Sequence, residues 1–157
     1  MIEAATLRLD RPADPAELRT IRTRVTAWAH AQALPEDVLT DLQLAVGEAV
    51  ANGVEHAYAN GELGTVEVEL TIRTTAQRAS AVRVRVVDHG HWRPMPAGAG
   101  YRGRGLTLIG RLADGLQVVA TRSGTQVCFE VPIPGRRADR HAKGGVGDVP
   151  CRVQEHS

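Results

Sequence analysis

Hydrophobic periodicity changes along this chain from helical spacing in its first third to strand-like alternation further on. Apolar residues recur every three or four positions over 14–33 and again over 35–57, which predicts two amphipathic helices. They alternate with polar residues over 66–72 and 82–86, which predicts two half-buried strands. A chain with this order can form neither a helical bundle nor a pure β-sandwich, because its helices must pack against a sheet.

Shorter segments complete the predicted order. Residues 6–9 alternate and predict a first strand, and a glycine-rich loop over 90–103 leads into a short helix over 106–113. Segments 116–121 and 126–131 predict a closing hairpin. The order β-α-α-β-β-α-β-β predicts an α+β fold, a two-layer α/β sandwich with a mixed, mostly antiparallel sheet and its helices on one face.

Length and composition favour a single soluble domain with an aliphatic core. Of the 157 residues, 43% are hydrophobic but only 3% aromatic. The domain is expected over 1–133, and the patternless segment 134–157 is expected to be a disordered tail. A formal charge of +1 provides no strong field toward nucleic acid or anionic lipid, and no apolar run reaches the roughly 20 residues of a membrane helix.

The two cysteines do not suggest a disulfide framework. Cys128 falls in an apolar strand segment and is expected to be a small buried hydrophobe, whereas Cys151 falls in the glycine-rich tail. The N-terminus is too acidic, and too short in its apolar part, for a signal peptide. A reducing, cytoplasmic location is therefore expected.

Four polar residues lie along one side of the second predicted helix. They have the spacing i, i+4, i+7 and i+8 and are Glu48, Asn52, Glu55 and His56. The same spacing is also common for polar residues on a solvated helix face. The residue types favour a Mg²⁺-phosphate site. The amide oxygen of Asn52 can take one metal position without adding negative charge, and Glu48 can orient or deprotonate an attacking hydroxyl.

A second group of candidates lies where strands end or begin. Asp88 ends a strand and is followed by Gly90, so a carboxylate there can accept the exocyclic amino group of adenine while the glycine lets the base approach closely. Thr125 opens the last strand, and its hydroxyl can face the same pocket. Both patterns are also typical of ordinary turns and strand starts.

The stretch Gly103-Arg104-Gly105-Leu106 leads from the loop into the third predicted helix. Free N–H groups and the positive dipole end at a helix start bind anions, and Arg102 or Arg104 can add charge toward phosphates. A plain glycine-rich connector is the alternative interpretation.

Two further patterns are rejected. Gly98, Gly100 and Gly103 match the dinucleotide-binding fingerprint, but they do not directly follow a strand and no acidic residue ends a strand about 20 residues later. His89 and His91 have a spacing that zinc accepts, yet no cysteine or third histidine is near in sequence, so they are interpreted as loop histidines.

The order of the motifs resembles that of the GHKL ATPases, which have the Bergerat ATP-binding fold and include DNA gyrase, MutL-type repair proteins, heat-shock chaperones and histidine kinases. The motifs are Glu-x-x-x-Asn on a helix, Asp-x-Gly after a strand, Gly-x-Gly-Leu into a helix and Gly-Thr before a strand. The resemblance covers about 7–132. Within it, segments 44–52, 87–90 and 103–106 are most similar to the anti-sigma regulatory factors with serine kinase activity.

This resemblance implies ATP and Mg²⁺ as cofactors and a role for each motif. Asn52 would carry the Mg²⁺, Glu48 would be the catalytic base, Asp88 would read adenine and Thr125 would support it. The glycines of the third motif would belong to a lid over the phosphates. The implied cofactor-binding set is Asn52, His56, Asp88, Gly90, Arg102, Gly103, Arg104, Gly105, Leu106 and Thr125.

The resemblance also implies a function. Members of that family sequester a sigma factor and phosphorylate a serine on an anti-anti-sigma (STAS-type) partner, often as homodimers, and no direct contact with nucleic acid or membrane is expected. One departure is Trp92, where many relatives have a second glycine, and it is expected to affect lid closure and phosphate transfer. The alternative is a non-catalytic nucleotide-binding module that regulates a partner by binding alone; a zinc or nucleic-acid accessory protein is a remote third.

Overall fold

A computed structural model describes residues 6–58, 64–74, 79–89, 102–121 and 124–137. Its elements confirm the predicted order and the predicted α+β class. In chain order they are β1 (Thr6–Pro12), α1 (Glu17–Ala31), α2 (Glu36–Tyr58), β2 (Thr65–Thr74), β3 (Ala79–Asp88), α3 (Arg102–Leu112), β4 (Asp114–Thr121) and β5 (Gly124–Arg137).

The strands form one sheet in the order β1-β2-β3-β5-β4. Each of its pairings is antiparallel, so the sheet of the described residues contains no parallel pair. The last strand, β5, lies between β3 and β4. In this position its alternate apolar side chains pack beside buried side chains of both neighbouring strands. This insertion brings the start of β5 beside the end of β3.

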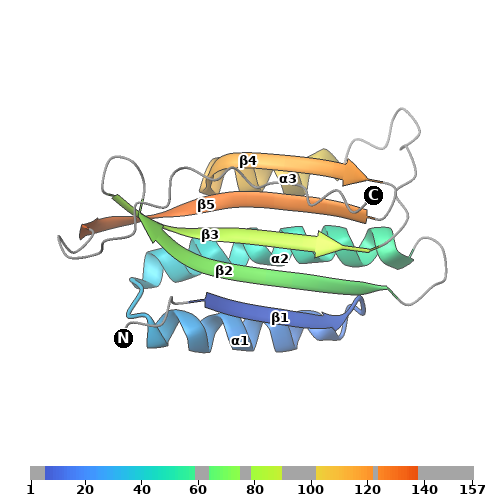
Figure 1. Cartoon of the computed structure of the whole chain (residues 1–157), viewed down its shortest axis with the longest axis horizontal. Coiled ribbons are helices and arrows are strands. Elements are labelled where there is room, and N and C mark those ends of the chain that lie inside the picture. The colour runs from blue at the N-terminus through green and yellow to red at the C-terminus, as the bar shows by residue number, and fades with distance from the viewer. Residues whose placement is uncertain (1–5, 59–63, 75–78, 90–101, 122–123, 138–157) are drawn as a thin grey trace.

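The helices lie together on one face of the sheet, with α2 between α1 and α3 (Figure 1). Alternation turns Val66, Val68 and Leu70 of β2 toward them, and each is at most 1% exposed. The core is aliphatic as predicted, with Phe129 of β5 as its largest fully buried side chain. Across the described segments, no helix has both the length and the hydropathy that a membrane span requires.

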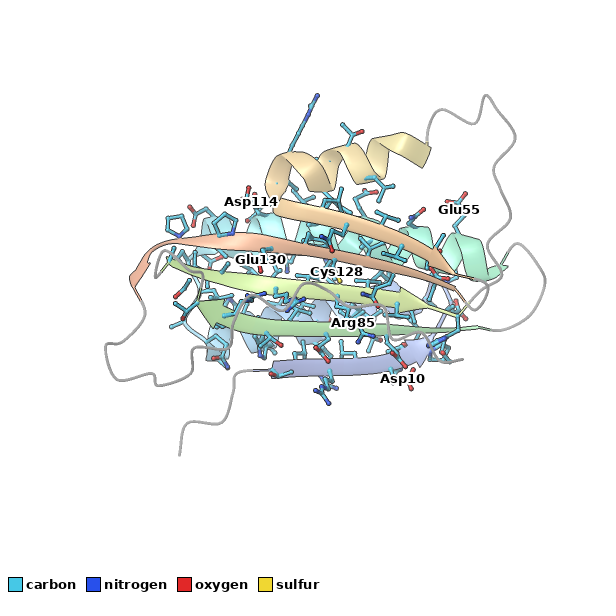
Figure 2. The ribbon with its side chains drawn as sticks, turned by 45° about the horizontal axis from the view of Figure 1, so that its top comes forward. Asp10, Glu55, Arg85, Asp114, Cys128 and Glu130 are labelled. Carbon is cyan, nitrogen blue, oxygen red and sulfur yellow. The ribbon has the colours of Figure 1, made fainter. Side chains whose placement is uncertain are left out.

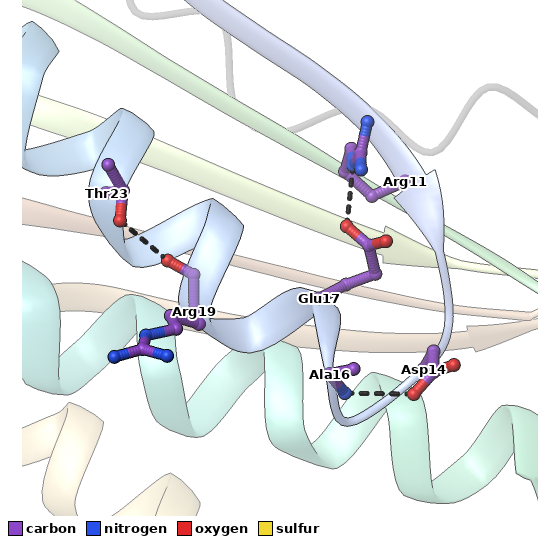
Figure 3. Close-up of polar contacts among 6 residues, drawn as sticks. All are labelled: Arg11, Asp14, Ala16, Glu17, Arg19 and Thr23. Carbon is purple, nitrogen blue, oxygen red and sulfur yellow. Dashed lines mark hydrogen bonds and ion pairs between the residues drawn. The ribbon is translucent and has the colours of Figure 1, made fainter.

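The connection from β1 to α1 is fixed by local polar contacts (Figure 3). Arg11 Nε donates to Glu17 Oε2 at 2.7 Å, which raises the pKa of the Arg11 guanidinium. The Ala16 N–H donates to Asp14 Oδ1 at 2.9 Å. Asp14 therefore closes the turn before α1.

Every strand and helix α3 extend beyond their predicted bounds, and two of these extensions affect the candidate site and the domain boundary. Helix α3 begins at Arg102, four residues before the predicted start at 106, so its first turn contains the glycines of the third motif. Strand β5 runs to Arg137, past the predicted strand end at 131 and the expected domain boundary at 133. It can do so because β3 begins at Ala79 and pairs with Arg137 across a bulge. Residues 138–157 lie outside the described part of the chain.

Cys128 departs from its prediction in one respect. Its side chain is buried, at 3% exposure, as expected. However, it is disulfide-bonded, so its interpretation as a simple buried hydrophobe was wrong. Sequence gave no sign of this bond, because the other cysteine falls in a segment without any secondary-structure pattern.

Gly124 is expected to tolerate no side chain. Its φ is +150°, and a Cβ atom built there would lie 1.7 Å from the Asp88 carbonyl oxygen. Gly124→Ala should therefore lower the free energy of unfolding by about 3 kcal/mol or more, measured by urea denaturation. Gly47→Ala is the control: its Cβ would meet nothing within 4 Å inside α2, so it should raise stability by about 0.5–1 kcal/mol. Equal effects of the two substitutions would contradict this account.

Candidate functional site

Asp88 is a buried carboxylate beneath α2. It ends β3 in phase with Val84 and Val86, so it faces the helices, and it is 4% exposed. Gly53 of α2 lies directly above it. A Cβ at Gly53 would be 3.3 Å from Asp88 Cβ and 3.5 Å from Asp88 Oδ2. The glycine thus lets the helix backbone come close to the carboxylate.

Thr125 joins Asp88 from the neighbouring strand. The two residues are register partners between β3 and β5, and the Thr125 N–H donates to Asp88 Oδ1 at 3.3 Å. The Thr125 hydroxyl is buried and has no hydrogen-bond partner among the described residues. Leaving a buried hydroxyl unpaired costs free energy. We therefore expect this oxygen to form a hydrogen bond with a water molecule or with a ligand.

Glu48 and Asn52 lie one turn apart on α2, and Glu48 also lines a groove between α1 and α2 together with Leu18 and Gln43. On the flank of α2 that faces α1, Gln43 Nε2 donates to the Thr26 hydroxyl. Gln43 and Asn52 differ by nine positions, which at about 100° per residue places them on opposite sides of the helix. Since α1 and α3 lie on opposite sides of α2, Asn52 is directed toward α3 (Figure 1). Both Glu48 and Asn52 are half-buried.

The other predicted site residues are only partly described. Glu55 is exposed on α2, and Leu106 of α3 packs against the core. Gly103 and Gly105 lie within the first turn of α3. Gly90 lies outside the described residues, as do the side chains of His56, Arg102 and Arg104. The structure thus brings Asp88 and Thr125 into contact and places Glu48 and Asn52 on the adjacent helix.

These groups fit an adenine nucleotide. The buried Asp88 carboxylate can accept from the exocyclic amino group of adenine, and the unpaired Thr125 hydroxyl can donate to a ring nitrogen. The described residues contain no group of three or more His, Cys, Asp or Glu side chains suited to a metal ion. A Mg²⁺ ion held by the Asn52 amide and by phosphate oxygens needs no such group.

Two glycines of this site escaped prediction. Gly53 and Gly124 both contact Asp88 closely enough to exclude a side chain or to strain one. A usable signal existed for Gly53, because a glycine inside a long helix costs roughly 1 kcal/mol relative to alanine and needs a packing reason. Gly124 was predicted only as the glycine of the Gly-Thr motif. Its steric role could not be predicted, because that role depends on the strand that lies opposite.

His89, which follows Asp88, behaves as an ordinary surface residue. It is exposed, and its Nε2 lies 3.4 Å from Glu67 Oε1. This position agrees with its interpretation as a loop histidine.

The chain belongs to the histidine kinase-like ATPase domain family, whose model matches residues 11–131. The match confirms the ATPase family that the four motifs indicate, and with it ATP as the ligand of the family. The matched range contains Glu48, Asn52, Asp88 and Thr125.

A solved structure shows the same fold. The RsbU and RsbW domains of Rv1364c from Mycobacterium tuberculosis superpose with a TM-score of 0.61 at 22% identity, over 85% of this chain and 34% of that chain. The present chain thus spans about a third of that protein. The histidine kinase domain of the Erythrobacter litoralis blue-light activated histidine kinase gives a TM-score of 0.48 at 21% identity, over 75% of this chain and 60% of that one.

Proposed function

We propose that this protein is an anti-sigma factor with ATP- and Mg²⁺-dependent protein serine kinase activity. It phosphorylates a serine of an anti-anti-sigma (STAS-type) partner and sequesters a sigma factor, as a cytoplasmic homodimer. One observation carries the nucleotide site: the carboxylate of Asp88 is buried against the backbone of Gly53, beside an unpaired Thr125 hydroxyl. The motif resemblance to the anti-sigma regulatory factors supports the choice of partners.

Each residue has a defined task in this proposal. Bound ATP and Mg²⁺ supply the transferable phosphoryl group and neutralise its charge. Asp88 and Thr125 select adenine, and the Asn52 amide oxygen holds the metal. Glu48, half-buried on the same flank as Asn52, accepts the proton of the serine hydroxyl. The start of α3 offers free N–H groups to the phosphates.

Phosphorylation of a purified anti-anti-sigma protein tests this function directly. The protein is incubated with that partner, Mg²⁺ and ATP labelled at the γ-phosphate, and phosphoserine is identified by mass spectrometry. Label on a serine of the partner is the expected result. Tight ATP binding without any label would instead favour the non-catalytic binding module.

Asn52→Ala is expected to remove the effect of Mg²⁺ on ATP binding. With the amide oxygen gone, affinity in Mg²⁺ should fall about tenfold, or about 1.4 kcal/mol, toward the metal-free value of the unchanged protein. Calorimetric titration with ATP, with and without Mg²⁺, measures this. Gln43→Ala removes an amide from the opposite flank of α2 and serves as the control, with the Mg²⁺ effect retained. A Mg²⁺ effect that survives in Asn52→Ala would exclude this residue as the metal ligand.

A further inference from the structure

A groove of about 660 Å³ lies between helices α1 and α2. Its lining combines apolar side chains of both helices with three charged groups, Arg19 and Arg22 of α1 and Glu48 of α2. Leu44 also lines the groove and is 42% exposed, although it is a large hydrophobic side chain. Exposed apolar surface that is bordered by charge is typical of a site that binds another protein.

The two walls of the groove can be aligned residue by residue. Helices α1 and α2 run antiparallel, because a short connection over 32–35 joins them. Gln43 Nε2 donates to the Thr26 hydroxyl, which fixes one pair of positions that face each other. One turn further from this pair, Arg22 on α1 therefore lies opposite Gly47 on α2, and both residues line the groove.

Gly47 has no packing role among the described residues. A glycine inside a helix costs roughly 1 kcal/mol relative to alanine, so a reason from packing or binding is expected. Gly53 has such a reason, because its missing side chain lets Asp88 come close to α2. At Gly47, which is half-buried, a Cβ atom would meet no atom of the described residues within 4 Å. The space at Gly47 is therefore open to a partner molecule.

The arginines of the α1 wall are cations without a counter-ion. Arg19 and Arg22 are exposed, and neither forms an ion pair within the described segments. Glu17 is bonded to Arg11 instead, and Figure 3 shows Arg19 extending away from that pair. Among the described lining residues, Glu48 is the one carboxylate, and it lies on the α2 wall. The α1 wall of the groove therefore favours an acidic partner segment.

We propose, on the basis of the proposed kinase function, that the groove between α1 and α2 docks the serine-bearing partner through an acidic segment that crosses α2 at Gly47. Carboxylates of this segment pair with Arg19 and Arg22, and one of its apolar side chains covers Leu44. The crossing ends beside Glu48, the residue that follows Gly47, and this places the serine hydroxyl near its base. The substrate is thus a protein whose acceptor serine is flanked by acidic and apolar residues.

Docking in the groove orients the serine and leaves the chemistry to the nucleotide site. In the transfer step, the serine oxygen forms a bond to the γ-phosphorus, the bond between that phosphorus and the β,γ-bridging oxygen breaks, and ADP leaves. The proton of the hydroxyl passes to the Glu48 carboxylate. The acidic residues of the segment stay at the α1 wall, where the arginines offset their repulsion from Glu48.

A side chain placed at Gly47 tests the crossing. Methionine favours the helix and meets no described atom at its Cβ, so Gly47→Met should keep its fold in thermal unfolding. Its affinity for a purified STAS-type anti-anti-sigma protein, measured by calorimetry with a non-hydrolysable ATP analogue and Mg²⁺, should fall at least about tenfold. Ala27→Met adds the same side chain at an exposed position of α1 outside the groove and should retain this affinity. Equal affinities of the two variants for the partner would overturn the proposal.

A charge reversal tests the acidic nature of the segment. Arg22→Glu should weaken binding of the same STAS-type protein by about tenfold at low ionic strength, and the loss should shrink as salt is added. Arg24→Glu makes the same change at an exposed position of α1 that does not line the groove, so it should retain most of the affinity. Equal losses in the two variants would show a general effect of the charge of α1 and would contradict a specific contact.

These measurements also separate the docking site from the proposed function, because binding does not require phosphoryl transfer. If binding depends on Gly47 and Arg22 but no serine is ever labelled, the kinase function is wrong and the docking site stands. If Gly47→Met labels the partner as fast as the unchanged protein does, the groove is not the docking site and the kinase function stands. Loss of self-association in Gly47→Met with full partner affinity, seen by sedimentation, would assign the groove to a second copy of the chain and overturn the proposal. A STAS-type protein that does not bind the unchanged chain at all would overturn both.

Discussion

Replacing Asp88 by asparagine is expected to weaken ATP binding by about 10- to 150-fold, which corresponds to the loss of about 1.5–3 kcal/mol from a charged hydrogen bond. The Thr125 N–H donates to Asp88 Oδ1, so an asparagine must keep its oxygen on that side. Its NH₂ group then takes the place of Oδ2, beside Gly53, and opposes the amino group of adenine with a second donor. Calorimetric titration with ATP measures the change.

Asp114→Asn is the matched control for this prediction. Asp114 is exposed at the start of β4, so the same change of charge there should leave ATP affinity within about twofold (Figure 2). Thermal unfolding without nucleotide should distinguish lost binding from lost fold, because asparagine preserves the bond to the Thr125 N–H. If Asp88→Asn binds ATP as tightly as the unchanged protein, the adenine assignment is wrong.

Glu48→Gln is expected to reduce transfer of the γ-phosphate to the serine partner by about 10²- to 10⁴-fold, the usual contribution of a general base. Glutamine keeps the size and hydrogen-bonding reach of glutamate but cannot take a proton at neutral pH. ATP affinity should stay within about twofold, because Glu48 acts on the serine hydroxyl and not on the base of the nucleotide. Single-turnover labelling of the partner, together with calorimetry, separates the two quantities.

Glu55→Gln makes the same chemical change further along α2 and should leave the rate of transfer near that of the unchanged protein. Glu55 is exposed, seven positions beyond Glu48 (Figure 2). Equal losses of activity in the two variants would indicate a general effect of charge on α2. Full activity in Glu48→Gln would remove Glu48 from its proposed role.

The sequence was sufficient for the elements, their order and the fold class, because hydrophobic periodicity is a local property of the chain. The stripe that contains Leu42, Val46, Ala49 and Val50 predicts α2, and the structure buries each of these side chains. Spacing within one helix likewise puts Glu48 and Asn52 on one flank. The bounds of β5 and of α3 could not be predicted from periodicity. The end of a strand or helix depends on the elements that pair or pack with it.

Tertiary structure decided which of these separate signals meet. The register between β3 and β5 brings Thr125 to Asp88, and α2 packs across that point so that Gly53 faces the carboxylate. Gly124 is required only because the Asp88 carbonyl lies opposite it. Contacts of this kind join residues far apart in sequence, whereas hydrophobic periodicity reports only on neighbours along the chain.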